Sequence, residues 1–373
     1  MRPGGVAGRF FFPGPSEVRP EILAAMGRRM IPHRGPEMRE LLARVHPRLQ
    51  ALLATARPVY VASGAATAMM EAAVRCAARQ RVLALVSGAF GERFARIAEL
   101  CGRDVTRINV PPGDVVTPEQ LALALEHGRY DAVTAVHVET TTGAVTDIAA
   151  LAAITREKAD TLLLVDAVSS AGGMPVACDA WGVDVAFFAS QKALACPPGL
   201  AFAWCSGRAL ERAAGMPGRG MYLDLVRYDE FWQRGETLGT PAVSVLYALD
   251  AQLEAIEAEG LDARFERHAA MRALVERWVA AARARDLPVG ILAAPGTRAP
   301  TVTALTYDGD CAALLQHLAR RGYVIGGGSG GLAATTVRIG HMGDHTVRAT
   351  EKLLGALEET MVELQGIRYG GQG

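Results

Sequence analysis

The chain has 373 residues, half of them hydrophobic, which is enough for one large domain and a smaller one around a substantial core. Lysine plus arginine and aspartate plus glutamate number 39 each, so no net charge favours a nucleic acid or an anionic membrane as the partner. We therefore expect a globular protein that acts on small molecules.

The cysteines and the apolar segments indicate where the protein works. The six cysteines form no C-x-x-C pair, and several lie in apolar runs, where a free thiol behaves as a small hydrophobic group. The N-terminus lacks an apolar stretch long enough for a signal peptide, and no later segment has about 18 consecutive apolar residues. We expect a cytoplasmic protein without a membrane span.

Short apolar runs alternate with helical periodicity over the first two thirds of the chain. Ser16 can cap a first helix that ends near Met30, and a second helix is expected over residues 36–55. The strands expected next are 58–62, 81–87, 104–110, 131–138, 161–168, 184–189 and 200–204, with helices at 67–79, 91–101, 117–128 and 147–159. This alternation predicts an α/β fold with a mainly parallel seven-stranded sheet flanked by helices.

The last third of the chain predicts a smaller C-terminal α+β domain. Long helices are expected at 242–259 and 261–285, short strands at 289–292, 301–307, 323–325 and 335–339, and further helices at 310–321 and 344–364. We expect three parts: an N-terminal segment near the active site at 1–20, a large ligand-binding domain at 21–260 and a small domain at 261–373.

One lysine, Lys192, follows a wholly apolar strand at 184–189. Such a strand is buried on both faces, so the lysine lies at a partly desolvated sheet edge. Desolvation disfavours the ammonium and lowers its pKa, as a Schiff-base lysine requires. The alternative is an ordinary surface lysine at a strand-to-loop junction.

Ligands of an open parallel sheet bind beyond the carboxyl ends of its strands, and three other ends have suitable residues. The turn Ser63-Gly-Ala-Ala-Thr67 places backbone N–H groups at the start of a helix. It can be a site that binds phosphate, which we call the phosphate cradle, or an ordinary tight turn. Phe90, between glycines, can stack on a flat cofactor or anchor the next helix. Asp166 closes an apolar strand and needs a cation, a buried arginine or a helix N-terminus beside it.

These features have more meaning together than separately. Lys192 lies 26 residues after Asp166 (192 − 166), enough for one crossover to the neighbouring strand, so both should face one crevice. A phosphate cradle, a stacking ring, a carboxylate for a ring N–H⁺ and a desolvated lysine together indicate pyridoxal 5′-phosphate.

The ordered motifs resemble the class V, fold-type I pyridoxal phosphate-dependent aminotransferases, most closely the alanine–glyoxylate and serine–glyoxylate (serine–pyruvate) group. The likeness extends from Phe12 to Gly343. The motifs are Val165-Asp-Ala-Val-Ser-Ser, Ser190-Gln-Lys-Ala-Leu, Pro197-Pro-Gly, His137-Val-Glu-Thr-Thr-Thr-Gly and Arg338-Ile-Gly-His-Met-Gly.

The resemblance implies a homodimeric enzyme, with its active site at the subunit interface, that moves an amino group from alanine or serine to glyoxylate or pyruvate in a ping-pong cycle. Lys192 would hold the cofactor and transfer protons, Asp166 would pair with the pyridine nitrogen, and Arg338 would bind the substrate carboxylate. The other implied contacts are Phe90 and Val168 on the two ring faces, Thr141 at the ring hydroxyl, and Ala65, Ala66, Thr67, Gln191 and a partner's Thr240 at the phosphate.

The sequence departs from the family pattern at two positions. Ala65 stands where the family cradle usually has serine, so a side-chain phosphate contact is lost while backbone contacts remain. Thr237 stands where some members have a tyrosine that reaches the neighbour's phosphate.

Several alternatives stay open or are disfavoured. A lyase or desulfurase of the same fold, or a non-catalytic pyridoxal phosphate-binding protein, remains possible from the sequence. The G-x-G-x-x-G string at 326–331 precedes a strand, so we expect a flexible substrate-side loop rather than a dinucleotide site. His341 and His345 lack a third ligand nearby, so no metal is expected. His137 is expected to be a hydrogen-bonded core histidine.

Overall fold

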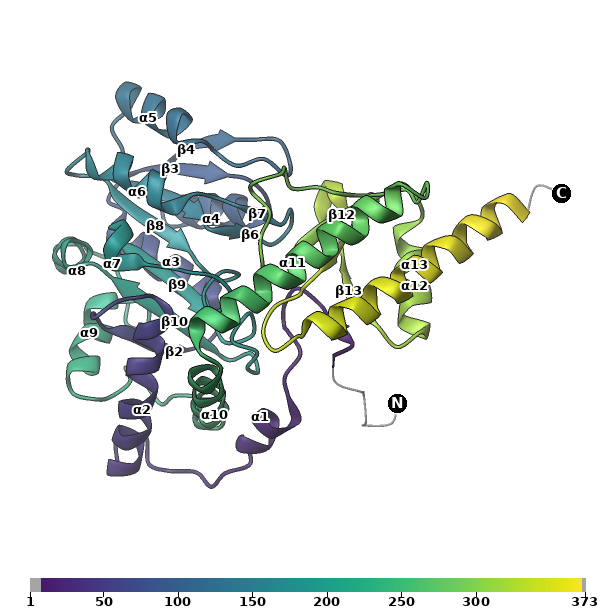
Figure 1. Ribbon diagram of the computed structural model, residues 1–373. Helices are drawn as coiled ribbons and strands as arrows, with labels where there is room; N and C mark the ends of the chain where they lie inside the picture. The colour runs from purple at the N-terminus through teal and green to yellow at the C-terminus, as the bar shows by residue number, and fades with distance from the viewer. Residues whose placement is uncertain (1–7, 371–373) are drawn as a thin grey trace.

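Seven apolar strands form the larger sheet of the computed structural model, which describes residues 8–370 (Figure 1). The strand order is β2-β10-β9-β8-β5-β3-β4, and all neighbours are parallel except β10, which is antiparallel to both β2 and β9. Each predicted strand of this sheet is present. Their bounds are β2 Val59–Ser63, β3 Arg81–Val86, β4 Asp104–Asn109, β5 Ala132–Val136, β8 Leu162–Asp166, β9 Val185–Ala189 and β10 Leu200–Cys205.

The apolar runs have no polar alternation because both faces of the sheet are covered. In β9, Ala186 and Phe188 belong to one hydrophobic core, whereas Phe187 and its neighbours on the same face belong to another. The first core is covered by α2 Pro36–Leu52, α5 Pro118–His127, α6 Ile148–Arg156, α7 Cys178–Trp181 and α10 Val243–Glu259. The second is covered by α3 Ala66–Ala77, α4 Ala89–Leu100, α8 Gly207–Ala214 and α9 Leu225–Gln233.

A second sheet of five strands lies beside the first, in the order β1-β13-β14-β12-β11. Its first strand, β1, comes from the N-terminal segment and pairs in parallel with β13, so an N-terminal segment completes a sheet built by the last third of the chain. The strands are β1 Phe10–Phe11, β11 Val289–Ile291, β12 Thr303–Tyr307, β13 Val324–Gly327 and β14 Thr336–Ile339. The helices packed on it are α11 Leu261–Arg283, α12 Cys311–Arg320 and α13 Val347–Gly370, and a hairpin of β6 Val138–Glu139 and β7 Ala144–Val145 is separate.

The expected first helix is wrong in its start and its length. Helix α1 covers only Pro20–Ala25, and Arg19, not Ser16, occupies its N-cap position. Ser16 instead donates its hydroxyl hydrogen to the carbonyl of Lys192 at 2.7 Å. The helices α8 and α9 were not predicted, because each has fewer than ten residues and gives little periodic signal.

Among the described helices, none combines the length and the hydrophobicity of a membrane span.

Candidate active site

Lys192 is the buried member of a set of only three lysines in the chain. It follows β9, its side chain is 8% exposed, and its Nζ donates to the carbonyl of Pro13 at 2.6 Å. Burial lowers the pKa of this amine to about 8, although the charge of Asp166 acts in the opposite direction. The alternative of an ordinary surface lysine is therefore excluded.

Asp166 ends the neighbouring strand β8, where it pairs in register with Phe187 of β9. Its carboxylate accepts a hydrogen bond from the amide of Val168 at 2.8 Å and is 3% exposed. Burial raises the pKa of Asp166 to about 7, while the Lys192 charge lowers it. The charge of each group thus affects the pKa of the other, and the two residues lie at the carboxyl ends of adjacent parallel strands.

Glu139 is a buried site residue that the sequence did not single out. Its Oε2 accepts from the amides of Phe90 and Gly91 at 3.0 and 3.2 Å, at the start of α4. Its Oε1 accepts from the hydroxyl of Thr141 at 2.6 Å. The available signal was an acid in a turn followed by hydroxyl residues, but only the fold brings it to a helix N-terminus, where a negative charge is stabilised.

Glu139 consequently holds two predicted cofactor contacts in place. The ring of Phe90 lies with its centroid 6.0 Å from the Lys192 Nζ, and the guanidinium of the exposed Arg93 lies 4.7 Å from the same centroid. The Thr141 hydroxyl also accepts from the amide of Ala89 at 3.3 Å.

The predicted phosphate cradle forms the start of α3. Ala65 is the N-cap residue and offers no side chain to the helix, so the N–H groups of Ala66 and Thr67 in the first turn have no capping partner. The buried Oε1 of Gln191 lacks a hydrogen-bond partner among the described residues, but this atom is an acceptor and does not add to the set of donors. Open donors at a helix start suit an anion.

Arg338 lies on β14 opposite Gly326 of β13, and it is half-buried. Its Nε donates to the carbonyl of Gly327 at 2.8 Å, and Nη1 donates to the carbonyl of Thr140 at 3.4 Å. Within residues 8–370 it forms no ion pair with a carboxylate. Burial lowers the pKa of Arg338, while Glu139 acts in the opposite direction.

The expected flexible loop at 326–331 is wrong in its first part, because Gly326 and Gly327 belong to strand β13. A side chain at Gly326 would collide with Pro13, so glycine allows the N-terminal segment to approach closely.

Thr240 lies on the exposed surface of the chain, two residues before Ala242, whose amide donates to the Ser63 hydroxyl at 2.8 Å. The hydroxyl of Thr237 donates to the carbonyl of Gly239 at 2.7 Å.

The remaining candidates lie outside this cluster. Nδ1 of the buried His137 has no partner among the described residues, so the expected hydrogen bond is absent at that atom. His341 contacts the Thr303 hydroxyl and the Pro300 carbonyl. In the described part of the chain, no group of three His, Cys, Asp or Glu side chains is arranged for a metal ion.

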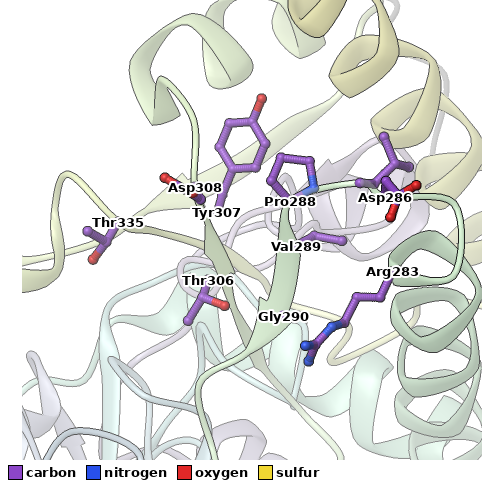
Figure 2. A pocket seen from close by; sticks show the side chains of 10 residues that line it. Arg283, Asp286, Pro288, Val289, Gly290, Thr306, Tyr307, Asp308 and Thr335 are labelled. Atoms are coloured by element: carbon purple, nitrogen blue, oxygen red, sulfur yellow. The ribbon is translucent and has the colours of Figure 1, made fainter.

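A cavity of about 560 Å³ opens at the other edge of the small sheet, between β11, β12 and the end of α11 (Figure 2). None of the predicted site residues lines it. This cavity is therefore separate from the candidate site.

The chain resembles known proteins over nearly its whole length. The family model described as aminotransferase class-V matches residues 21–351. A protein named soluble hydrogenase, small subunit, from Synechococcus sp. is 33% identical over 361 residues, with 94% of this chain and 92% of that protein covered. The L-aspartate–glyoxylate aminotransferase of Paracoccus denitrificans is 31% identical over 374 residues, covering 95% and 91%. The solved alanine–glyoxylate aminotransferase of Nostoc sp. is 34% identical with a TM-score of 0.88, and 97% of each chain is covered.

Lys192 should react with amine reagents at an unusually low pH. In reductive methylation of the cofactor-free protein between about pH 6 and about pH 11, we expect a midpoint near 8, compared with ~10.4 for a model lysine. Below the midpoint the amine is protonated and does not react. Mass spectrometry of the lysine peptides measures this, with Lys158 and Lys352 as references for the reagent. A Lys192 midpoint above about 10 would contradict the burial argument.

Proposed function

The chain belongs to the class V family of pyridoxal 5′-phosphate-dependent aminotransferases, which share the fold-type I architecture, and we propose that it transfers an amino group between alanine or serine and glyoxylate or pyruvate. The family, fold and enzyme class expected from the sequence are thus confirmed. The observation that most supports the proposal is that Asp166 ends β8 and the buried Lys192 follows the adjacent β9, while the charges of Asp166 and Arg338 both act on the pKa of the lysine amine.

The residues present fit the cofactor. A phosphate would bind the uncapped N–H groups at Ala66 and Thr67, and the Nε2 amide hydrogens of Gln191 are a further contact that we propose. A ring N–H⁺ beside Asp166 would favour the carboxylate over the neutral acid that burial promotes. Further contacts that we propose are Phe90 and Val168 with the ring faces and Thr141 with the ring hydroxyl.

When bound, the cofactor supplies an electron sink for the bond broken at the substrate's Cα. Lys192 would take the proton from Cα and return one later in the cycle, because a pKa of about 8 keeps both protonation states accessible near neutral pH. The guanidinium of Arg338, without a carboxylate partner in residues 8–370, would bind the substrate carboxylate through parallel N–H donors.

Removal of the lysine amine tests its role directly. We expect Lys192→Ala to lose the visible absorbance of covalently held cofactor and to lower turnover by about 10²- to 10⁴-fold or more, the usual contribution of acid–base catalysis. Lys352→Ala, at an exposed position of α13, is the matched control and should keep both properties. Full turnover by Lys192→Ala would refute the assignment.

The amino donor and acceptor are tested by a substrate panel. We expect alanine or serine with glyoxylate or pyruvate to exceed aspartate or 2-oxoglutarate by about tenfold or more in kcat/KM. Aspartate is the sharpest competitor, because the Paracoccus relative is named for it and the exposed Arg93 lies beside Phe90. A preference for aspartate or 2-oxoglutarate would contradict the proposed substrates, and release of sulfide or ammonia would indicate a lyase.

We also propose a homodimer in which Thr240 reaches the phosphate site of the partner subunit. Thr240 is exposed in the single chain, and so are the nearby Met221 and Tyr222, at 61% and 41%. Tyr222 donates to the carbonyl of Ser63 at the edge of the cradle at 2.7 Å, which connects this apolar surface to the site. Sedimentation velocity should give a dimer, and a monomer with full cofactor affinity would contradict this placement.

The location and the internal division of the chain remain part of the proposal. All six cysteines are free, which fits a cytoplasmic protein. Gly260, with φ +82°, separates α10 from α11 and supports the division between a large domain at 21–260 and a small domain at 261–373.

A further inference from the structure

Arg264, in the first turn of α11, is an almost fully buried charged side chain, at 1% exposure. Its guanidinium donates to the carbonyls of Ala193 and Gly172 at 2.7 and 3.0 Å. It also forms ion pairs with Glu259 and Asp344 at 2.8 and 3.0 Å. One side chain therefore joins four segments of the chain.

Three of these four segments lead to a proposed site residue. Ala193 is the residue after Lys192, and Gly172 lies in the loop that follows Asp166. Asp344 lies six residues beyond Arg338 (344 − 338), in the turn after β14. Figure 1 shows α11 extending from the large sheet to the small one.

The lysine loop presents three successive carbonyls, and each has a donor from a distant segment. The backbone amide of Ser16 donates to Gln191 at 2.9 Å, and the Ser16 hydroxyl donates to Lys192. Arg264 supplies the bond to Ala193. A buried carbonyl without a donor is costly, so loss of Arg264 would allow the peptide beside Lys192 to turn.

We propose that Arg264 is a positioning residue for Lys192: it fixes the peptide after the lysine and so directs the amine toward the substrate. The inference rests on the proposed role of Lys192. The competing explanation is a purely structural ion pair between α10, α11 and the turn at Asp344.

Arg267 separates these explanations because it lies one turn further along α11. It pairs with the same Glu259 at 2.6 Å and donates to the carbonyls of Gly343 and His345. Those contacts stay on the small-sheet side of the site and do not include the lysine loop. Arg267→Met therefore removes a comparable ion pair while leaving the bond to Ala193 intact.

The experiment compares holoenzymes of wild type, Arg264→Met, Arg264→Lys and Arg267→Met. For Arg264→Met we expect the pH midpoint of the bound-cofactor absorbance to move by about half a unit or more, and kcat to fall about tenfold to a hundredfold, as for a reacting group displaced by about 1 Å. The rate at which the cofactor-free protein captures pyridoxal phosphate should fall as well. Arg267→Met should keep the wild-type midpoint and capture rate, even if its Tm falls.

The proposal is overturned if Arg264→Met titrates and captures cofactor as the wild type does, or if Arg267→Met changes both as strongly. If Arg264→Met does not fold, Arg264→Lys decides: it keeps the charge but cannot span the four acceptors, so its midpoint should still move. A wild-type chain without the bound-cofactor band would overturn the proposed function and this inference together.

Discussion

The burial of a positive charge at the carboxyl end of the large sheet is the constraint on which the site depends. The ammonium of Lys192 is poorly solvated, so its pKa falls to about 8. Asp166 and Glu139 partly compensate with negative charge, whereas Arg338 adds a second cation to the same crevice. With burial and the neighbouring charges acting on its pKa in this way, the amine can exchange a proton near neutral pH, provided that the surrounding segments keep water out.

Those surrounding segments come from distant parts of the chain. The Pro13 carbonyl accepts from the lysine amine, Ser16 donates to the carbonyls of Gln191 and Lys192, and Arg264 donates to the carbonyl of Ala193. The loop that follows β9 is thus held by groups that are not part of the large sheet. The apolar interior makes the sheet rigid, and these polar contacts orient the loop that contains Lys192.

The sequence predicted the strands of the large sheet well, because a run such as Val185–Ala189 is apolar on both faces and leaves few alternatives. Lys192 and Asp166 were proposed as site residues because each follows or ends a predicted strand, whereas Arg338 was proposed only from the family resemblance. Glu139 and Arg264 were not found, since their importance arises only from long-range contacts. Ser16 was assigned to a helix cap for the same reason: its local sequence suits a cap, but a tertiary hydrogen bond takes its hydroxyl.

The pairing of β1 with β13 has a consequence for how the protein is made. Phe10 pairs with Val324, residues separated by 314 positions (324 − 10), so this contact closes almost the whole chain. The Pro13 carbonyl gains its fixed place only when that pairing exists. When the ribosome has synthesised all strands of the large sheet, the hydrogen bond between the Lys192 amine and the Pro13 carbonyl cannot yet have its final geometry. The site is complete only after the C-terminal third of the chain has been synthesised and has folded.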